Sequence, residues 1–184
     1  MDSKRARRII CCPCLTLCLD ARSPHVSQPL TAAFGCAKTV RNDNSSRFGK
    51  FIVLFFDRSG KTASAQISTY LLEKSRVTHV GPGERSYHVF YGLFALPAAE
   101  LAKLKLAPSK SKYLYLAHGE EMPPAQAKVL NDDADAAYTA QGIDQADRQA
   151  WNALLAGVLH LGNLQFDPTN EELATLLPAG TEAL

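Results

Sequence analysis

An unbroken apolar and aromatic run, KFIVLFF at residues 50–56, constrains most strongly what this chain can fold into. The run has the length of a β-strand and predicts one that is buried on both faces. A turn sequence with Gly60 follows it, and residues 62–72 then alternate between small or polar and larger side chains. Two such runs separated by a glycine turn predict an antiparallel hairpin.

Helical spacing dominates after residue 81. The side chains of one predicted helix face recur at i, i+3, i+4 and i+7, and this helix ends before Pro97. These side chains are Tyr87, Phe90, Tyr91 and Phe94. A second short helix is expected over residues 132–141, where Gly142 ends it.

The clearest helix covers residues 145–161. Asp144 is placed to cap its first turn, and Gly162 to adopt a left-handed conformation after its last. One apolar stripe is expected to face the core and contains Trp151, Leu154, Leu155, Val158 and Leu159.

Composition and charge narrow the class of protein. The 184 residues suit one domain or a piece of a larger one, and 46% hydrophobic with 21% charged residues is typical of a globular chain. The net charge is +2, and the first eight residues carry +3 of it, so the remainder has a charge of −1. This balance predicts no nucleic-acid partner. No apolar run reaches the roughly 20 residues of a membrane span.

Residues 1–24 form a basic and cysteine-rich leader. KRARR followed by IICCPCLTLCL has the outline of a signal peptide, but Leu19 occupies a place where cleavage needs a small residue. Lipidation of the cysteines is an alternative. We expect a disordered or mispredicted segment with no fold of its own. Cys36 stands alone in the remaining sequence, so we expect no disulfide framework.

The polar run RNDNSSRFGK at residues 41–50 raises the question of function. Serine hydroxyls suit Mg²⁺, which prefers oxygen ligands, and asparagine amides can donate to phosphate oxygens. Arginine offers a planar fork for a carboxylate or a phosphate. Taken alone, the run is also explained as a polar turn that is capped by its own side chains.

Four ordered stretches resemble the myosin motor domain, and together they favour the nucleotide loop. The stretches are AFGCAKTVRNDNSSRFGKF at 33–51, TYLLEKSRV at 69–77, ERSYHVFYGL at 84–93 and LLAGVLHLGNLQF at 154–166. The first resembles the switch I loop of that family. The resemblance implies an α/β fragment, with a few strands of the myosin central (transducer) sheet followed mainly by α-helices.

The resemblance assigns roles to single residues. Ser46 resembles the serine that coordinates Mg²⁺, and Ser45 the one beside the γ-phosphate of ATP and the attacking water. Asn42 resembles the asparagine that contacts the phosphates, while Asn44 shapes the same ATP-binding loop. Arg47 resembles the arginine whose ion pair with a switch II glutamate closes the site. Ser45 and Arg47 are therefore the catalytic candidates, and Asn42, Asn44, Ser45 and Ser46 the binding candidates.

The resemblance also implies domain limits and a cellular role. Residues 25–168 are expected to be a partial motor domain, from switch I into the upper 50 kDa region, and residues 169–184 a trailing segment of the same domain. The implied function is an ATP-dependent motor on actin filaments in the cytoplasm and cytoskeleton. A non-catalytic remnant or a protein-binding module is the alternative.

Two parts of a myosin ATP site are missing from the sequence. SGKT at 59–62 imitates a P-loop, but Phe55 occupies the place of its first glycine, and a hairpin turn explains the match better. Switch II would lie beyond residue 184, and with it the expected partner of Arg47. Enzymatic activity of this chain therefore stays open, and we expect it to be inactive alone.

Several other polar residues have structural explanations. His88 and His160 are expected to pack in or near the core. His88 lies among Tyr87, Phe90 and Tyr91, and His160 has no acidic or cysteine partner nearby in sequence. Glu84 and Arg85 are expected to pair weakly at the surface. Glu73 is expected on a solvated edge or in an ion pair between elements.

Overall fold

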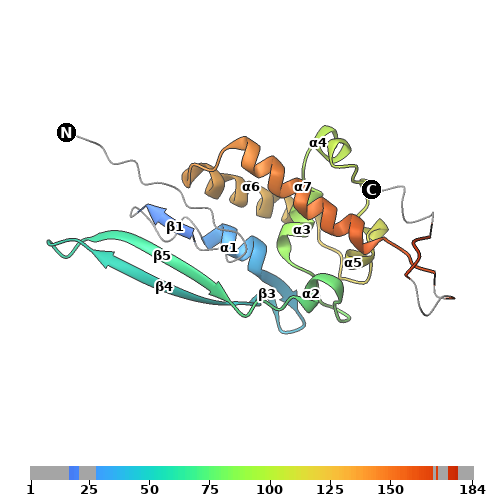
Figure 1. Ribbon diagram of the computed structural model, residues 1–184, viewed down its shortest axis with the longest axis horizontal. Coiled ribbons are helices and arrows are strands. Elements are labelled where there is room, and N and C mark those ends of the chain that lie inside the picture. Colours follow the sequence, from blue (N-terminus) through green and yellow to red (C-terminus); the bar gives the residue numbers. More distant parts are fainter. Residues whose placement is uncertain (1–16, 21–27, 168, 170–173, 178–184) are drawn as a thin grey trace.

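The computed structural model describes residues 17–20, 28–167, 169 and 174–177, and it joins a small β-region to a helical body. A three-stranded antiparallel sheet has the order β1-β5-β4, and a two-stranded sheet pairs β2 with β3. The strands are β1 (Leu17–Asp20), β2 (Cys36–Thr39), β3 (Asn42–Ser46), β4 (Gly49–Phe56) and β5 (Thr62–Tyr70). The β4–β5 hairpin extends away from the helices (Figure 1).

The helical body contains seven α-helices among the described residues. They are α1 (Gln28–Gly35), α2 (Ser75–Thr78), α3 (His88–Leu93), α4 (Ala98–Lys103), α5 (Leu114–Ala117), α6 (Pro124–Ala140) and α7 (Gln145–Gly162), with a 3-10 turn at Lys110–Lys112. The expected α/β fragment, a few strands followed by helices, is confirmed. None of these helices is both long and apolar enough to cross a bilayer.

The predicted hairpin is present, but its strand β4 is not buried as expected. β4 and β5 pair antiparallel from Gly49 opposite Tyr70 to Phe55 opposite Ser64. The expectation that residues 50–56 are buried on both faces is wrong, because Phe51 is 63% exposed and four more apolar side chains are at least 40% exposed. The run has strand length and β-propensity, whereas burial requires neighbouring elements that the described residues do not supply.

Four residues of the leader form a strand of the three-stranded sheet. Leu17–Asp20 pairs with residues 64–67 of β5. The other residues of the 1–24 segment lie outside the described part, as does most of 169–184.

The main core surrounds α3, as its spacing predicts. Tyr87, Phe90 and Tyr91 are at most 5% exposed, and Leu159 of α7 is fully buried against the same cluster. Phe94 is partly buried and packs on this core. The helix itself is short, because Tyr87 is its extended N-cap and Phe94 its C-cap.

α6 begins earlier than expected. It runs over Pro124–Ala140, whereas the sequence predicts a helix over 132–141 only. Pro124 occupies the first helical turn, where a missing N–H is tolerated, so the prolines start this helix. Gly142 follows its end with φ of 64°, a conformation that favours glycine.

The predicted cap of α7 is confirmed, and two other expectations for α7 are wrong. Asp144 Oδ1 accepts a hydrogen bond from the Asp147 N–H at 2.9 Å. Leu154 is 70% exposed, so it does not belong to the buried stripe. Gly162 lies inside the helix, and the ring of Tyr115 packs against it so closely that a Cβ would lie 2.7 Å from a ring carbon. Close packing therefore explains this glycine.

We predict that Gly162→Ala destabilises the fold by about 1–3 kcal/mol, because its methyl group overlaps the Tyr115 ring. Gly157→Ala in the same helix is the matched control, since nothing lies within 4 Å of a Cβ there. It should stabilise by up to about 1 kcal/mol through helix propensity. Urea denaturation measures both free energies of unfolding, and equal effects of the two substitutions would contradict the packing explanation.

Candidate functional site

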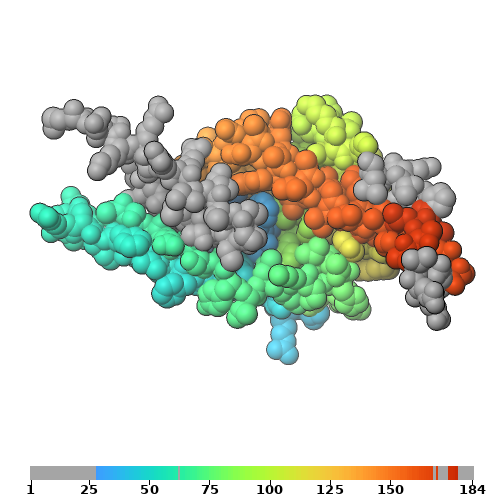
Figure 2. All heavy atoms as spheres, viewed as in Figure 1, coloured from blue at the N-terminus to red at the C-terminus, as the bar shows by residue number. Residues whose placement is uncertain are grey.

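The polar run forms a strand rather than a loop. β3 pairs antiparallel with β2, placing Ser46 opposite Cys36 and Ser45 opposite Ala37. The N–H of Arg47 continues this contact by donating to the Gly35 carbonyl at 2.8 Å. The segment around the β2–β3 turn stands out from the surface in Figure 2. All five site candidates lie within this one segment, and three of them are exposed, namely Asn42, Asn44 and Ser46.

The short side chains of β3 are partly engaged with one another. The Asn44 N–H donates to Asn42 Oδ1 at 2.9 Å, a local contact of the kind that explains a polar turn. Ser46 Oγ donates to the Phe48 carbonyl at 3.2 Å. A hydroxyl that donates its proton keeps its lone pairs, so Ser46 Oγ can still act as a metal ligand. Burial raises the pKa of the Cys36 thiol beside it.

Arg47 has a carboxylate partner among the described residues, and the ion pair with a switch II glutamate that the resemblance assigns to it stays a prediction. Arg47 Nε donates to Glu73 Oε2 at 2.6 Å, and Arg47 Nη1 donates to Ser45 Oγ at 3.2 Å. The two backbones meet as well, because the Glu73 N–H donates to the Arg47 carbonyl at 3.0 Å. Arg47 thus connects a catalytic candidate to the segment that follows β5.

Glu73 is shared between two arginines, which confirms the ion pair between elements. Arg76 Nε donates to the same Glu73 oxygen at 2.8 Å, and Arg76 Nη1 reaches Glu84 at 3.0 Å. The hydrogen bond from Arg76, supported by that from Arg47, lowers the pKa of the Glu73 carboxyl. Arg76 is only 6% exposed, so its charge depends on these carboxylates.

The position of Glu73 is fixed by a backbone turn before it and by a hydrogen bond to its carbonyl. Leu71 adopts a left-handed backbone with φ of 55°, which turns the chain sharply after β5. The Tyr87 hydroxyl donates to the Glu73 carbonyl at 2.7 Å, and burial raises the pKa of Tyr87 to about 12. This phenol therefore remains a hydrogen-bond donor at neutral pH.

The expected surface pair of Glu84 with Arg85 is wrong. Each of the two side chains has its own partner. Arg85 is 4% exposed and donates to the carbonyl of Glu120 and to its carboxylate, both at 3.2 Å. Glu84 binds Arg76 instead. The adjacent charges of Glu84 and Arg85 gave no signal of such burial.

Both histidines are buried, as expected, and each also makes a polar contact that the sequence did not predict. His160 Nε2 lies 3.1 Å from the Leu104 carbonyl. His88 Nε2 lies 3.1 Å from Asn44 Oδ1, so it contacts one of the site candidates directly. Nothing in the spacing of the two residues could have predicted this pairing across 44 positions.

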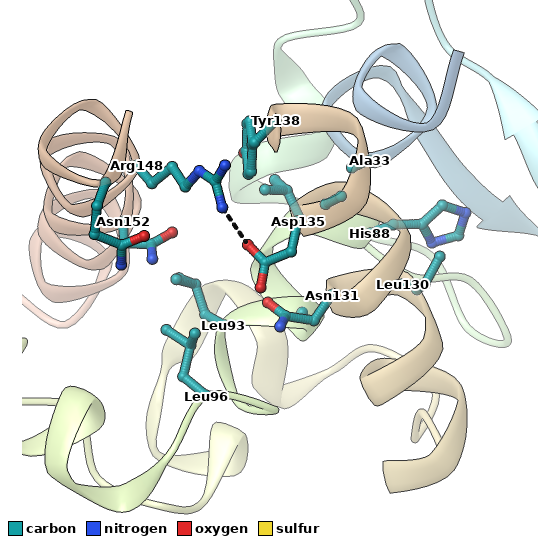
Figure 3. A pocket seen from close by; sticks show the side chains of 14 residues that line it. Ala33, His88, Leu93, Leu96, Leu130, Asn131, Asp135, Tyr138, Arg148 and Asn152 are labelled. Carbon is teal, nitrogen blue, oxygen red and sulfur yellow. Dashed lines mark ion pairs between the residues drawn. The ribbon is translucent and has the colours of Figure 1, made fainter. Parts of the chain in front are cut away.

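A cavity elsewhere in the molecule does not include the site candidates. It has a volume of about 100 Å³ and lies between α1, α3, α6 and α7. Figure 3 shows the Asp135 carboxylate facing the Arg148 guanidinium there, and the two groups are 3.7 Å apart. The β3 side chains lie instead on an open surface, where a ligand would still need walls from other polypeptide. The described residues also contain no cluster of three or more acidic, histidine or cysteine side chains that could hold a metal.

Comparison with known proteins decides the family. The family model described as myosin head (motor domain) matches residues 25–183. The chain belongs to the myosin motor-domain family. It is 43% identical to Myosin-14 of Arabidopsis thaliana over 146 residues, and 40% identical to Myosin-6 of the same plant over 163 residues. These alignments cover 79% and 86% of this chain, but only 10% of each relative. The chain thus spans about a tenth of these myosins.

The donor set of β3 fits the ligands that a myosin motor uses in general, namely a nucleotide with Mg²⁺. Its exposed groups are one hydroxyl and two amides, and Ser45 adds a half-buried hydroxyl. A hard cation that arrives with phosphate oxygens needs only one or two such oxygens from protein, so the lack of an acidic cluster does not conflict with it.

We predict that Glu73→Gln lowers the free energy of unfolding by about 1 kcal/mol at pH 7, because both arginines lose their shared charge. The depressed pKa of Glu73 stabilises the fold above its ordinary value of 4.5, and this contribution is lost as the pH falls below that value. The difference between the two proteins should therefore shrink from pH 7 to pH 3. Urea titrations across this range measure it.

The matched control is Glu100→Gln, which breaks an exposed pair with Lys103 and should change stability little. A difference between native protein and Glu73→Gln that stays constant with pH would contradict the assignment.

Proposed function

We propose that this chain is the switch I part of an ATP-dependent motor that moves on actin filaments in the cytoplasm and cytoskeleton. Membership of the myosin motor-domain family supports the motor. The observation that carries the proposal for the site is the exposed strand β3. It presents two neighbouring hydroxyls and two amides beside a tethered guanidinium.

Each of these groups suits one task in phosphate chemistry. Ser46 Oγ would hold the Mg²⁺ that neutralises phosphate charge. The Asn42 and Asn44 amides would donate to phosphate oxygens, and the Ser45 hydroxyl would orient the attacking water. Such groups position and stabilise, because phosphoryl transfer requires little covalent chemistry from the protein.

Arg47 is the group whose partner would change during the cycle. It is bound to Glu73 and Ser45 here, and both contacts lie at the end of β3. Closure around ATP would move Arg47 to a switch II glutamate from polypeptide outside this sequence. Exchange of one ion pair for another costs little net energy, which suits a reversible switch.

The proposal requires the rest of a motor. The P-loop, switch II and most of the actin-binding surface would come from polypeptide outside the 184 residues. No contact among the described residues favours the alternative of a non-catalytic binding module.

We predict weak, Mg²⁺-dependent binding of a fluorescent ATP analogue to the 184-residue chain. Ser46→Ala should weaken this binding roughly tenfold, because a charge-assisted contact is lost. Ser59→Ala, in the exposed β4–β5 turn, is the matched control and should bind as the native chain does. Binding that is equal with and without Mg²⁺, or unaffected by Ser46→Ala, would refute the site.

We also predict that the chain alone hydrolyses ATP negligibly, because the 184 residues contain no P-loop, whose lysine dominates phosphate binding in such enzymes. Release of radiolabelled phosphate, with and without actin filaments, measures this activity. Turnover equal to that of a complete motor would show that the missing parts are not needed.

A further inference from the structure

A buried histidine, His88, contacts strand β3 through one ring nitrogen. His88 opens α3 and is 3% exposed, although Asn44 in β3 is exposed. His88 Nε2 lies 3.1 Å from Asn44 Oδ1. His88 also lines the cavity between α1, α3, α6 and α7, and Figure 3 shows its ring directed away from the Asp135–Arg148 pair in that cavity. The polar contact of the ring is therefore with β3 and not with that pair.

The geometry defines which nitrogen carries the proton. An amide oxygen only accepts hydrogen bonds, so Nε2 of His88 is the protonated donor and Nδ1 is bare. Burial, with the nearby Arg85 charge, lowers the pKa of His88, which keeps the ring neutral at pH 7. Nδ1 has no hydrogen-bond partner and is buried.

This orphan acceptor makes a merely structural role costly. A buried polar atom without a partner destabilises a fold by about 1–3 kcal/mol, and an apolar side chain among the aromatic residues of this core would avoid that cost. The ring compensates for this cost only through the hydrogen bond from Nε2 to Asn44 Oδ1. The bond matters because it determines which way the Asn44 amide points.

An amide presents an acceptor on one side and donors on the other. With Oδ1 held by His88, the NH₂ group of Asn44 is left to donate to an anion. If the bond were absent, the amide could rotate by 180° and turn its oxygen toward the same anion. The neighbouring Asp43 is held separately, through Lys38 at 3.2 Å, but that carboxylate is 74% exposed and its pair is weak.

We infer that His88 is a positioning residue that orients the Asn44 amide and steadies β3 for phosphate binding without touching the nucleotide. This inference rests on the proposed function of β3 as a nucleotide strand.

Two substitutions separate the two ring nitrogens. In His88→Gln the side-chain amide lies near the original Nε2 position and can restore the bond to Asn44, whereas in His88→Asn the amide reaches only the original Nδ1 position. Both are uncharged amides of similar burial cost, so a general loss of stability should affect them alike. Thermal unfolding of the full 184-residue chain, native and variant, verifies that each is folded.

The first measurement is amide hydrogen exchange by NMR without nucleotide. We expect His88→Asn to speed exchange at residues 44–46 about fivefold, and His88→Gln to leave it near the native rate. Residues 50–55 of β4 are the internal reference and should not change. In an Asn44→Ala background the two variants should exchange alike, because the acceptor is gone.

The second measurement is affinity for a fluorescent ATP analogue with Mg²⁺. We expect His88→Asn to weaken binding about fivefold and His88→Gln to restore it. Equal exchange and equal affinity in the two variants would overturn the inference. Absence of Mg²⁺-dependent binding by the native chain would instead overturn the proposed function, which the exchange measurement does not test.

Discussion

One carboxylate joins the two halves of this molecule. Glu73 accepts from Arg47 at the end of β3 and from Arg76 in α2, and its backbone carbonyl accepts from Tyr87 at the start of α3. The strands, the short helix and the main core thus meet at one residue. Because Arg76 is almost completely buried, removing this carboxylate would leave its charge with Glu84 alone. The contact is therefore structural as well as adjacent to the site.

The same arrangement explains how an exposed strand can hold a defined shape. β3 belongs to a sheet of only two strands, which is marginal by itself. Its end is fixed by Arg47 and its middle by the contact between His88 and Asn44. Both contacts come from elements that pack on the aromatic core. A strand anchored at two points and otherwise open suits a segment that must meet a ligand and respond to it, as proposed for switch I.

Local patterns predicted much of the secondary structure. The alternation after Gly60 indicated the hairpin, the aromatic spacing after Tyr87 indicated α3, and Asp144 marked the start of α7. The errors concern what each element packs against. The apolar side chains of β4 were expected to be buried and are exposed, since hydrophobicity does not specify a neighbour. Gly162 was expected to supply a left-handed cap, and it supplies space for an aromatic ring.

The sequence by itself determined the family, the order of the hairpin and the main helices, and the concentration of serine, asparagine and arginine side chains in one short run. These properties depend on local composition, spacing and ordered motifs. Only the tertiary structure decided that this run is a paired strand, that Arg47 is bound to Glu73, and that His88 reaches Asn44. Contacts between residues 26 and 44 positions apart follow from how the segment of Glu73 and the start of α3 meet β3 and Arg47. Such packing is a property of the whole core, and no short stretch of sequence encodes it.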